Sequence, residues 1–117
     1  MTSITLDLEF TRANLDHDCV LLKGLMQIAV EDLPVLAAEL RDAADGHDVG
    51  QLHHLGHAIK GLVSNFRAEP LTALAEQLEQ ATLGANGLCW TRLVDEVIEA
   101  CENTSLALQA ELRLAPL

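Results

Sequence analysis

Hydrophobic and polar residues follow one another along most of this chain with the three- and four-residue spacing of an amphipathic α-helix. Short polar or glycine-containing breaks divide the pattern into four segments, which we expect to be helices at about residues 18–45, 49–66, 70–83 and 91–112. No run of β-branched residues alternates with polar ones, so the pattern gives no indication of strands.

Two further features refine this picture. Pro34 lies inside the first segment, and because proline has no N–H to donate and crowds the preceding turn, we expect a kink or a break there. Residues 6–14 are expected to form a short helix that covers one end. Four amphipathic helices with short connections predict an all-α protein, an antiparallel up-and-down four-helix bundle with a short extra N-terminal helix.

Length and composition support one domain of this kind. The 117 residues suffice for a single domain, which we divide into an N-terminal arm or short helix at 1–16 and a helical bundle at 17–113. Half of the residues are hydrophobic and only 3% are aromatic, so the core is expected to consist mainly of aliphatic side chains.

Charge and cysteine usage exclude several classes of function. A formal net charge of −11 disfavours binding to nucleic acid or to anionic membranes. No apolar run approaches the roughly 20 residues that span a bilayer, and the chain begins without the features of a signal peptide. The three cysteines form no CxxC pair, so we interpret them as small buried thiols in a reducing compartment and expect a cytoplasmic protein.

The candidate chemistry lies in the second segment. On a helical wheel His57 points away from the apolar stripe and shares its face with His53, Lys60, Gly61 and Ser64. A glycine inside a helix costs about 1 kcal/mol relative to alanine, and no turn requires one here. Gly61 instead clears space beside the imidazole, so that a bulky partner can approach. If the His57 imidazole carried a phosphoryl group, the Lys60 ammonium three residues on would lie within reach and stabilise its negative charge.

At this point the sequence resembles the histidine-containing phosphotransfer (HPt) domain. The family's pattern of a histidine, two residues and Lys-Gly is reproduced by residues 57–61, and Phe66 matches its large apolar position nine residues after the histidine. The resemblance covers roughly residues 18–83, and the matching positions outside the histidine helix are 31–34, 36–40, Ala68, Leu71, Leu74, Leu78 and Glu79. Arg67 departs from the family, which usually has glycine there.

The resemblance implies a function and a role for each residue. An HPt domain carries a phosphoryl group between receiver-domain aspartates in a multistep two-component phosphorelay. His57 would be the phosphoacceptor, attacking through Nε2, Lys60 would offset the phosphoryl charge, and Gly61 would make room for the receiver. Glu79 matches a position that hydrogen-bonds the imidazole, although the adjacent Gln80 is an alternative. Such a protein is a phosphocarrier rather than an enzyme.

The resemblance also implies the partners. These are response-regulator receiver domains and a hybrid sensor histidine kinase, with magnesium held by the receiver and no cofactor in this chain. The expected docking rim consists of Leu25, Met26, His53, Ser64 and Arg67. For the wide apolar face of the first segment, however, we favour core contact with two neighbouring helices, and a docking patch that includes Leu25 and Met26 is the alternative. We expect a monomer, although that face could instead close a dimer.

Two alternatives remain open at this stage. The first is an HPt-like bundle that docks a signalling partner without carrying phosphate. The second is a metal-binding helical protein, because His53 and His57 are four residues apart and His54 and His47 are near them in sequence. The local sequence lacks the glutamate and third ligand of a recognisable zinc-hydrolase motif, so we predict no metal site.

Overall fold

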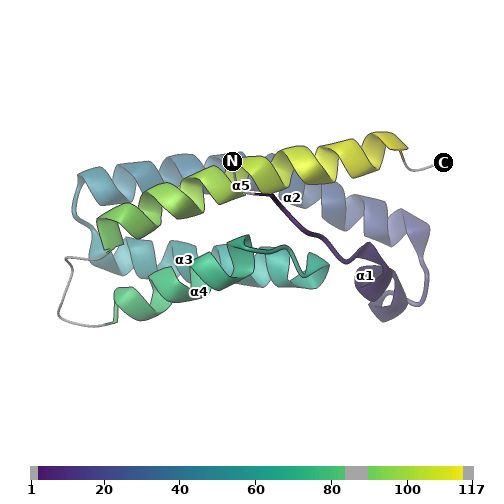
Figure 1. Cartoon of the computed structure of the whole chain (residues 1–117), viewed down its shortest axis with the longest axis horizontal. Coiled ribbons are helices and arrows are strands. Elements are labelled where there is room, and N and C mark those ends of the chain that lie inside the picture. The colour runs from purple at the N-terminus through teal and green to yellow at the C-terminus, as the bar shows by residue number, and fades with distance from the viewer. Residues whose placement is uncertain (1–2, 84–89, 115–117) are drawn as a thin grey trace.

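The computed structural model describes residues 3–83 and 90–114. In these residues the chain forms α1 (Leu8–Asn14), α2 (Cys19–Asp45), α3 (Val49–Val63), the 3-10 helix η1 (Ser64–Phe66), α4 (Leu71–Ala81) and α5 (Trp90–Leu114). The helices α2 to α5 lie side by side and successively reverse direction in an elongated bundle, while α1 lies across one end (Figure 1). The predicted antiparallel four-helix bundle with an extra N-terminal helix is therefore confirmed.

An aspartate fixes the start of each of the first three helices. The side chains of Asp7, Asp18 and Asp48 each accept a hydrogen bond from the backbone amide three residues further on, at 3.0, 3.0 and 3.1 Å. Such caps satisfy one of the amides that have no partner inside the helix. The cap at Asp48 sets where α3 begins, and so which side chains of α3 face the core and which face solvent.

The helix α2 continues through Pro34 without a break. Proline cannot donate to the carbonyl four residues earlier, which belongs to Val30. The buried Ser105 of α5 donates its hydroxyl to that carbonyl at 2.8 Å. The expectation of a break at Pro34 is wrong, because a residue on another helix replaces the hydrogen bond that proline removes.

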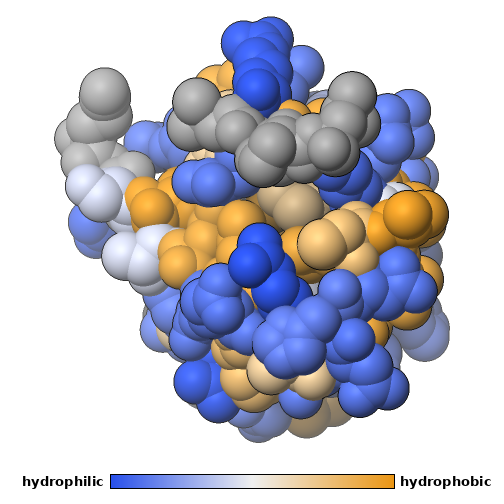
Figure 2. Space-filling model, turned by 90° about the vertical axis from the view of Figure 1, so that its right-hand side faces the viewer, coloured by the Kyte–Doolittle hydropathy of each residue, from blue (hydrophilic) through white to orange (hydrophobic). Residues whose placement is uncertain are grey.

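The core runs along the axis of the bundle and is almost entirely aliphatic. Its largest fully buried side chains are Phe66, Leu33, Leu40, Leu52, Ile59, Leu71, Leu78, Leu108, Val63, Val94, Val97 and Thr104. At the end where α1 lies, apolar surface remains visible at the centre of the molecule with polar side chains around it (Figure 2). The outer face of α3 is exposed at His57, 70% of whose side chain is accessible to solvent.

The N-terminal segment is fastened to the turn that follows α3. Thr5 and Glu69 exchange backbone hydrogen bonds of 2.9 and 3.0 Å. The amide of Asp7 donates to the carbonyl of Phe66 at 2.8 Å, and the Thr11 hydroxyl donates to the carbonyl of Asn65 at 2.6 Å. The segment before α2 therefore belongs to the folded unit and supports the C-terminal end of the histidine helix.

Candidate functional site

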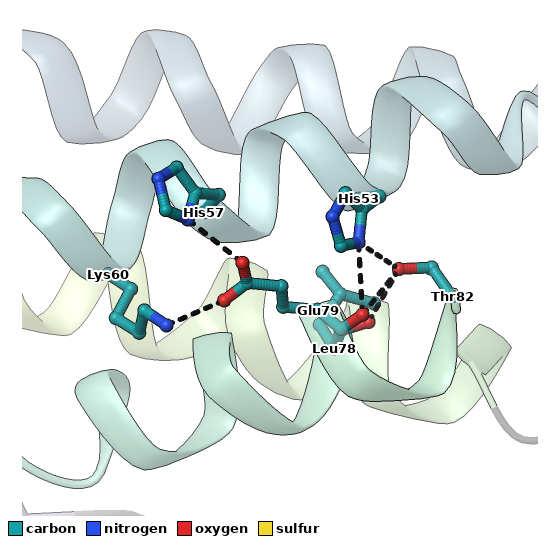
Figure 3. A network of polar contacts seen from close by, with 6 residues as sticks. All are labelled: His53, His57, Lys60, Leu78, Glu79 and Thr82. Atoms are coloured by element: carbon teal, nitrogen blue, oxygen red, sulfur yellow. Dashed lines mark hydrogen bonds and ion pairs between the residues drawn. The ribbon is translucent and has the colours of Figure 1, made fainter. Parts of the chain in front are cut away.

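The site is built around His57 on the outer face of α3. Its side chain is 70% exposed, and its Nδ1 lies 2.8 Å from Oε2 of Glu79, which belongs to α4 (Figure 3). A carboxylate can only accept, so Nδ1 carries the hydrogen of this bond. The other ring nitrogen, Nε2, points away from Glu79 and keeps its lone pair in the neutral imidazole (Figure 3).

Glu79 also binds the lysine of the motif. The Nζ of Lys60 lies 2.7 Å from Oε1 of Glu79, so one carboxylate contacts both Lys60 and His57 through its two oxygens (Figure 3). The Glu79 side chain is only 12% exposed. The hydrogen bonds from Lys60 and, second, from His57 lower the pKa of Glu79 below its usual value, and the bond to Glu79 raises the pKa of Lys60. The carboxylate therefore stays ionised and remains an acceptor for Nδ1–H.

The two helical glycines near His57 have opposite surroundings. A methyl group added at Gly61 would meet no atom within 4 Å outside the backbone of its own helix and its chain neighbours, so packing does not require glycine there. A methyl group at the buried Gly56 would lie 3.2 Å from the carbonyl oxygen of Ala75 and 3.3 Å from the amide nitrogen of Glu79. Gly56 thus allows α3 and α4 to approach closely at Glu79, while Gly61 leaves open space one turn after His57.

His53 and Ser64 lie on α3 and directly after it. His53 is half-buried, and its Nδ1 lies 3.0 Å from the backbone oxygen of Glu79 and 3.1 Å from Oγ1 of Thr82. Ser64 is exposed, and its hydroxyl contacts the carbonyl of Gly61 at 3.4 Å. His53 therefore faces α4 as well as the surface.

Two residues expected on the docking rim have other positions. Met26 is 3% exposed and belongs to the core, whereas Leu25 beside it is half-buried. Arg67 has a left-handed backbone with φ of 47°, the conformation that favours the glycine usual at this position in relatives. Its guanidinium lies 3.8 Å from the ring centre of Phe10 and 3.8 Å from a carboxylate oxygen of Asp7. Arg67 thus contacts the N-terminal segment and not the phosphoacceptor face.

The structure also decides between Glu79 and Gln80, and it adds two residues that the sequence analysis did not identify. Glu79 contacts His57, whereas Gln80 is exposed. Gly56 and Thr82 both contact Glu79 or its neighbours. A second glycine inside the histidine helix was a usable signal for Gly56, whereas no feature of the sequence marks Thr82.

Neither a metal cluster nor a membrane span is found in the part of the chain that the structure describes. Within residues 3–83 and 90–114, no three His, Cys, Asp or Glu side chains are grouped so that they could hold a metal ion. His53 and His57 direct their Nδ1 atoms at different oxygens of Glu79. No helix among the described residues is long and apolar enough to cross a bilayer.

A helical bundle that presents an exposed histidine held at Nδ1 by a carboxylate and open at Nε2 has the architecture of a histidine phosphocarrier. The family model for the Hpt domain matches residues 24–113, and the chain belongs to this family. Its structure is similar to the crystal structure of histidine-containing phosphotransfer protein B from Pseudomonas aeruginosa PAO1, with a TM-score of 0.83 and 19% sequence identity over 95% of this chain and 96% of that one. A comparison with curated proteins found no match.

Family membership confirms the predicted class of function. The chain is a histidine phosphotransfer protein of the kind that works in phosphorelays, and HPt proteins interact with receiver and kinase domains.

Proposed function

We propose that His57 is the phosphoacceptor and that Nε2 is the atom phosphorylated. The observation that carries this proposal is the hydrogen bond of 2.8 Å between Nδ1 and Glu79, because it leaves Nε2 as the nucleophile on an exposed ring. In the transfer, a bond forms between Nε2 and phosphorus while the bond from phosphorus to the receiver's aspartate oxygen breaks. The aspartate leaves as a carboxylate, and the reverse reaction passes the group on.

Glu79 and Lys60 fit the charge changes of this reaction. Once Nε2 has bonded to phosphorus, the ring holds Nδ1–H and carries a positive charge, which the Glu79 carboxylate stabilises at 2.8 Å. The Lys60 ammonium balances that carboxylate at 2.7 Å, and about a third of its side chain remains exposed. We propose that Lys60 acts first through Glu79 and also offsets the phosphoryl charge.

The space over Gly61 gives the receiver access to the ring. Since no atom lies within 4 Å of the position of an added methyl group, loops of a partner can approach the imidazole from this side. The fold gains nothing from glycine there and loses about 1 kcal/mol of helix stability relative to alanine. Partner approach is the requirement that explains the residue.

We further propose that the receiver docks beside this site on α2. The large exposed apolar side chains of α2 include a stripe at seven-residue intervals, formed by Leu21, Ile28 and Val35, which are 47%, 48% and 55% exposed. Arg41 pairs with Asp95 of α5, so it marks the flank of α2 that faces α5. The stripe lies roughly 120 to 160° around the helix from Arg41, on a different flank. Glu39, one turn after Val35, lines a hollow together with Gln51 of α3. The stripe therefore lies on the flank of α2 that adjoins the histidine helix.

The partners in this proposal are a hybrid sensor histidine kinase and a response regulator, whose receiver domains would supply magnesium and the catalytic pocket. The protein would then be a phosphocarrier that acts as a monomer in the cytoplasm, where Cys19 and Cys101 would remain free thiols. Cys101 is buried, whereas Cys19 is exposed, so the expectation of a buried thiol is wrong for Cys19.

The proposal is tested by intact-mass measurement after incubation with magnesium and a panel of phosphorylated receiver domains, including one shown to bind the protein. The parent protein is expected to gain one phosphoryl group that is labile in acid and stable in base, and His57→Gln is expected to gain none while keeping its helicity. Phosphorylation of the glutamine variant would refute the site. Binding without any mass gain would favour a bundle that only docks receivers.

A further inference from the structure

The first of the three histidines of α3, His53, binds the backbone of the same residue whose side chain binds His57. Its Nδ1 lies 3.0 Å from the carbonyl oxygen of Glu79 (Figure 3). A carbonyl oxygen only accepts hydrogen bonds, so Nδ1 of His53 carries a hydrogen and donates it. The Oγ1 of Thr82, 3.1 Å from the same nitrogen, lies beside this bond and donates its own hydrogen to the carbonyls of Leu78 or Glu79.

The carbonyl of Glu79 has no partner inside its own helix. It is one of the last four carbonyls of α4, which cannot all be satisfied within the helix. The amide four residues on, that of Leu83, donates to Gln80 instead, at 3.2 Å. His53 and the Thr82 hydroxyl therefore supply the hydrogen bonds to the Glu79 carbonyl, and His53 ties this last turn of α4 to α3.

The backbone of Glu79 also packs closely against α3 at Gly56. Gly56 lies between His53 and His57 on α3, and a side chain there would press on the Glu79 amide at 3.3 Å. The close packing at Gly56 fixes how near the two helices come, and the bond from His53 fixes the last turn of α4 along α3. Together they place the Glu79 carboxylate where it meets Nδ1 of His57 and Nζ of Lys60.

We propose that His53 is a positioning residue for phosphotransfer, which acts on His57 through the backbone of Glu79. The inference rests on the proposed function of His57. His53 is not a second acceptor in this proposal, because the position one turn after it is occupied by the His57 side chain, whereas the corresponding position after His57 is the open Gly61.

The test uses three variants of the whole chain. His53→Leu removes the donor and keeps a similar shape. His53→Asn keeps an N–H donor at the place of Nδ1, because the asparagine amide nitrogen occupies the same position on its side chain. His54→Leu, at the exposed neighbouring position, makes the same chemical change without touching α4. Circular dichroism and thermal unfolding establish that each variant is folded.

The first readout is the ¹⁵N NMR spectrum of the His57 ring, which reports the hydrogen on Nδ1 without any phosphorylation. His53→Leu is expected to lower the population with hydrogen on Nδ1, and His53→Asn and His54→Leu are expected to keep it. The second readout is the rate of phosphorylation by a receiver, which we expect His53→Leu to slow about fivefold, the effect of losing one hydrogen bond.

The outcomes separate the two proposals. A His57 tautomer population in His53→Leu equal to that of the parent protein would overturn the role of His53, and so would a failure of His53→Asn to restore what His53→Leu loses. If the parent protein accepted no phosphoryl group, the proposed function would fail, while the NMR measurement would still decide whether His53 positions Glu79 and the His57 ring.

Discussion

The Glu79 side chain of α4 holds the His57 ring of α3 by a hydrogen bond of 2.8 Å between Oε2 and Nδ1. The exposed histidine therefore does not rotate freely, although 70% of its side chain is in contact with solvent. Because the carboxylate is anionic, the bond both orients the ring and increases the electron density at Nε2.

Replacing Glu79 is expected to slow phosphorylation more when the new side chain loses more of the contacts with His57 and Lys60. Glutamine can still accept from Nδ1–H through its amide oxygen, but its NH₂ group would oppose the Lys60 ammonium. Alanine removes both contacts, which we expect to slow the reaction about tenfold, the effect of losing a charged hydrogen bond. Single-turnover rates with one phosphorylated receiver should fall in the order parent, Glu79→Gln, Glu79→Ala. A Glu79→Ala protein as fast as the parent would contradict the role given to this bond.

The same carboxylate makes a pH-dependent contribution to stability. The pKa of Glu79 is lowered from 4.5 in the folded protein, so its pairing with Lys60 and His57 stabilises the fold fully above that value and is lost as the pH falls through the folded-state pKa. Urea unfolding should show the parent to be more stable than Glu79→Gln at pH 7, with the difference shrinking below about pH 4.5. A difference that stayed constant down to pH 3 would mean that the ion pair is not its source.

Gly61→Ala is expected to raise the free energy of unfolding and, at the same time, to slow phosphorylation by receivers. The added methyl group meets no atom within 4 Å outside the backbone of its own helix and its chain neighbours, and it should stabilise α3 by about 1 kcal/mol. Phosphorylation by receivers should nevertheless become slower, because the methyl group occupies the approach to the ring. Gly24→Ala is a control for the stability gain alone, because a methyl group there also meets no atom within 4 Å outside its own helix backbone, whereas Gly24 lies between Leu21 and Ile28 on the proposed docking stripe. Unchanged transfer rates in a stabilised Gly61→Ala protein would contradict the access role.

The bond between Ser105 and Val30 predicts a coupling with Pro34. Ser105→Ala leaves the Val30 carbonyl without its donor and should cost about 1–2 kcal/mol of unfolding free energy. In a Pro34→Ala background the new amide at residue 34 can bond that carbonyl, so the same serine change should cost less. A double-mutant cycle by urea unfolding measures the difference. Additive effects would show that the serine does not replace the hydrogen bond lost at the proline.

The sequence predicted the features that depend on one helix at a time. The wheel placed His57, Lys60 and Gly61 on the exposed face of α3 because that face follows from the apolar stripe alone. It could not show that Met26 enters the core while Leu25 is only half-buried, because that depends on how α2 is rotated against its neighbours.

Contacts between helices were less accessible from the sequence. Glu79 was reached through the family resemblance and not through its spacing, and the bond from His53 to its backbone depends on the fit of α3 against α4. The unbroken α2 depends on Ser105, a residue of the last helix, and no local signal connects that residue with Pro34.

Phosphorylation of His57 at Nε2, with Nδ1 still bonded to Glu79, can be read at both ring nitrogens in one experiment. The ¹⁵N-labelled protein is phosphorylated by a receiver domain, kept at alkaline pH and observed by ³¹P and ¹⁵N NMR. We expect one phosphorus signal coupled to Nε2 of His57, with the hydrogen retained on Nδ1. A phosphoryl group on Nδ1, or on any other residue, would refute this assignment.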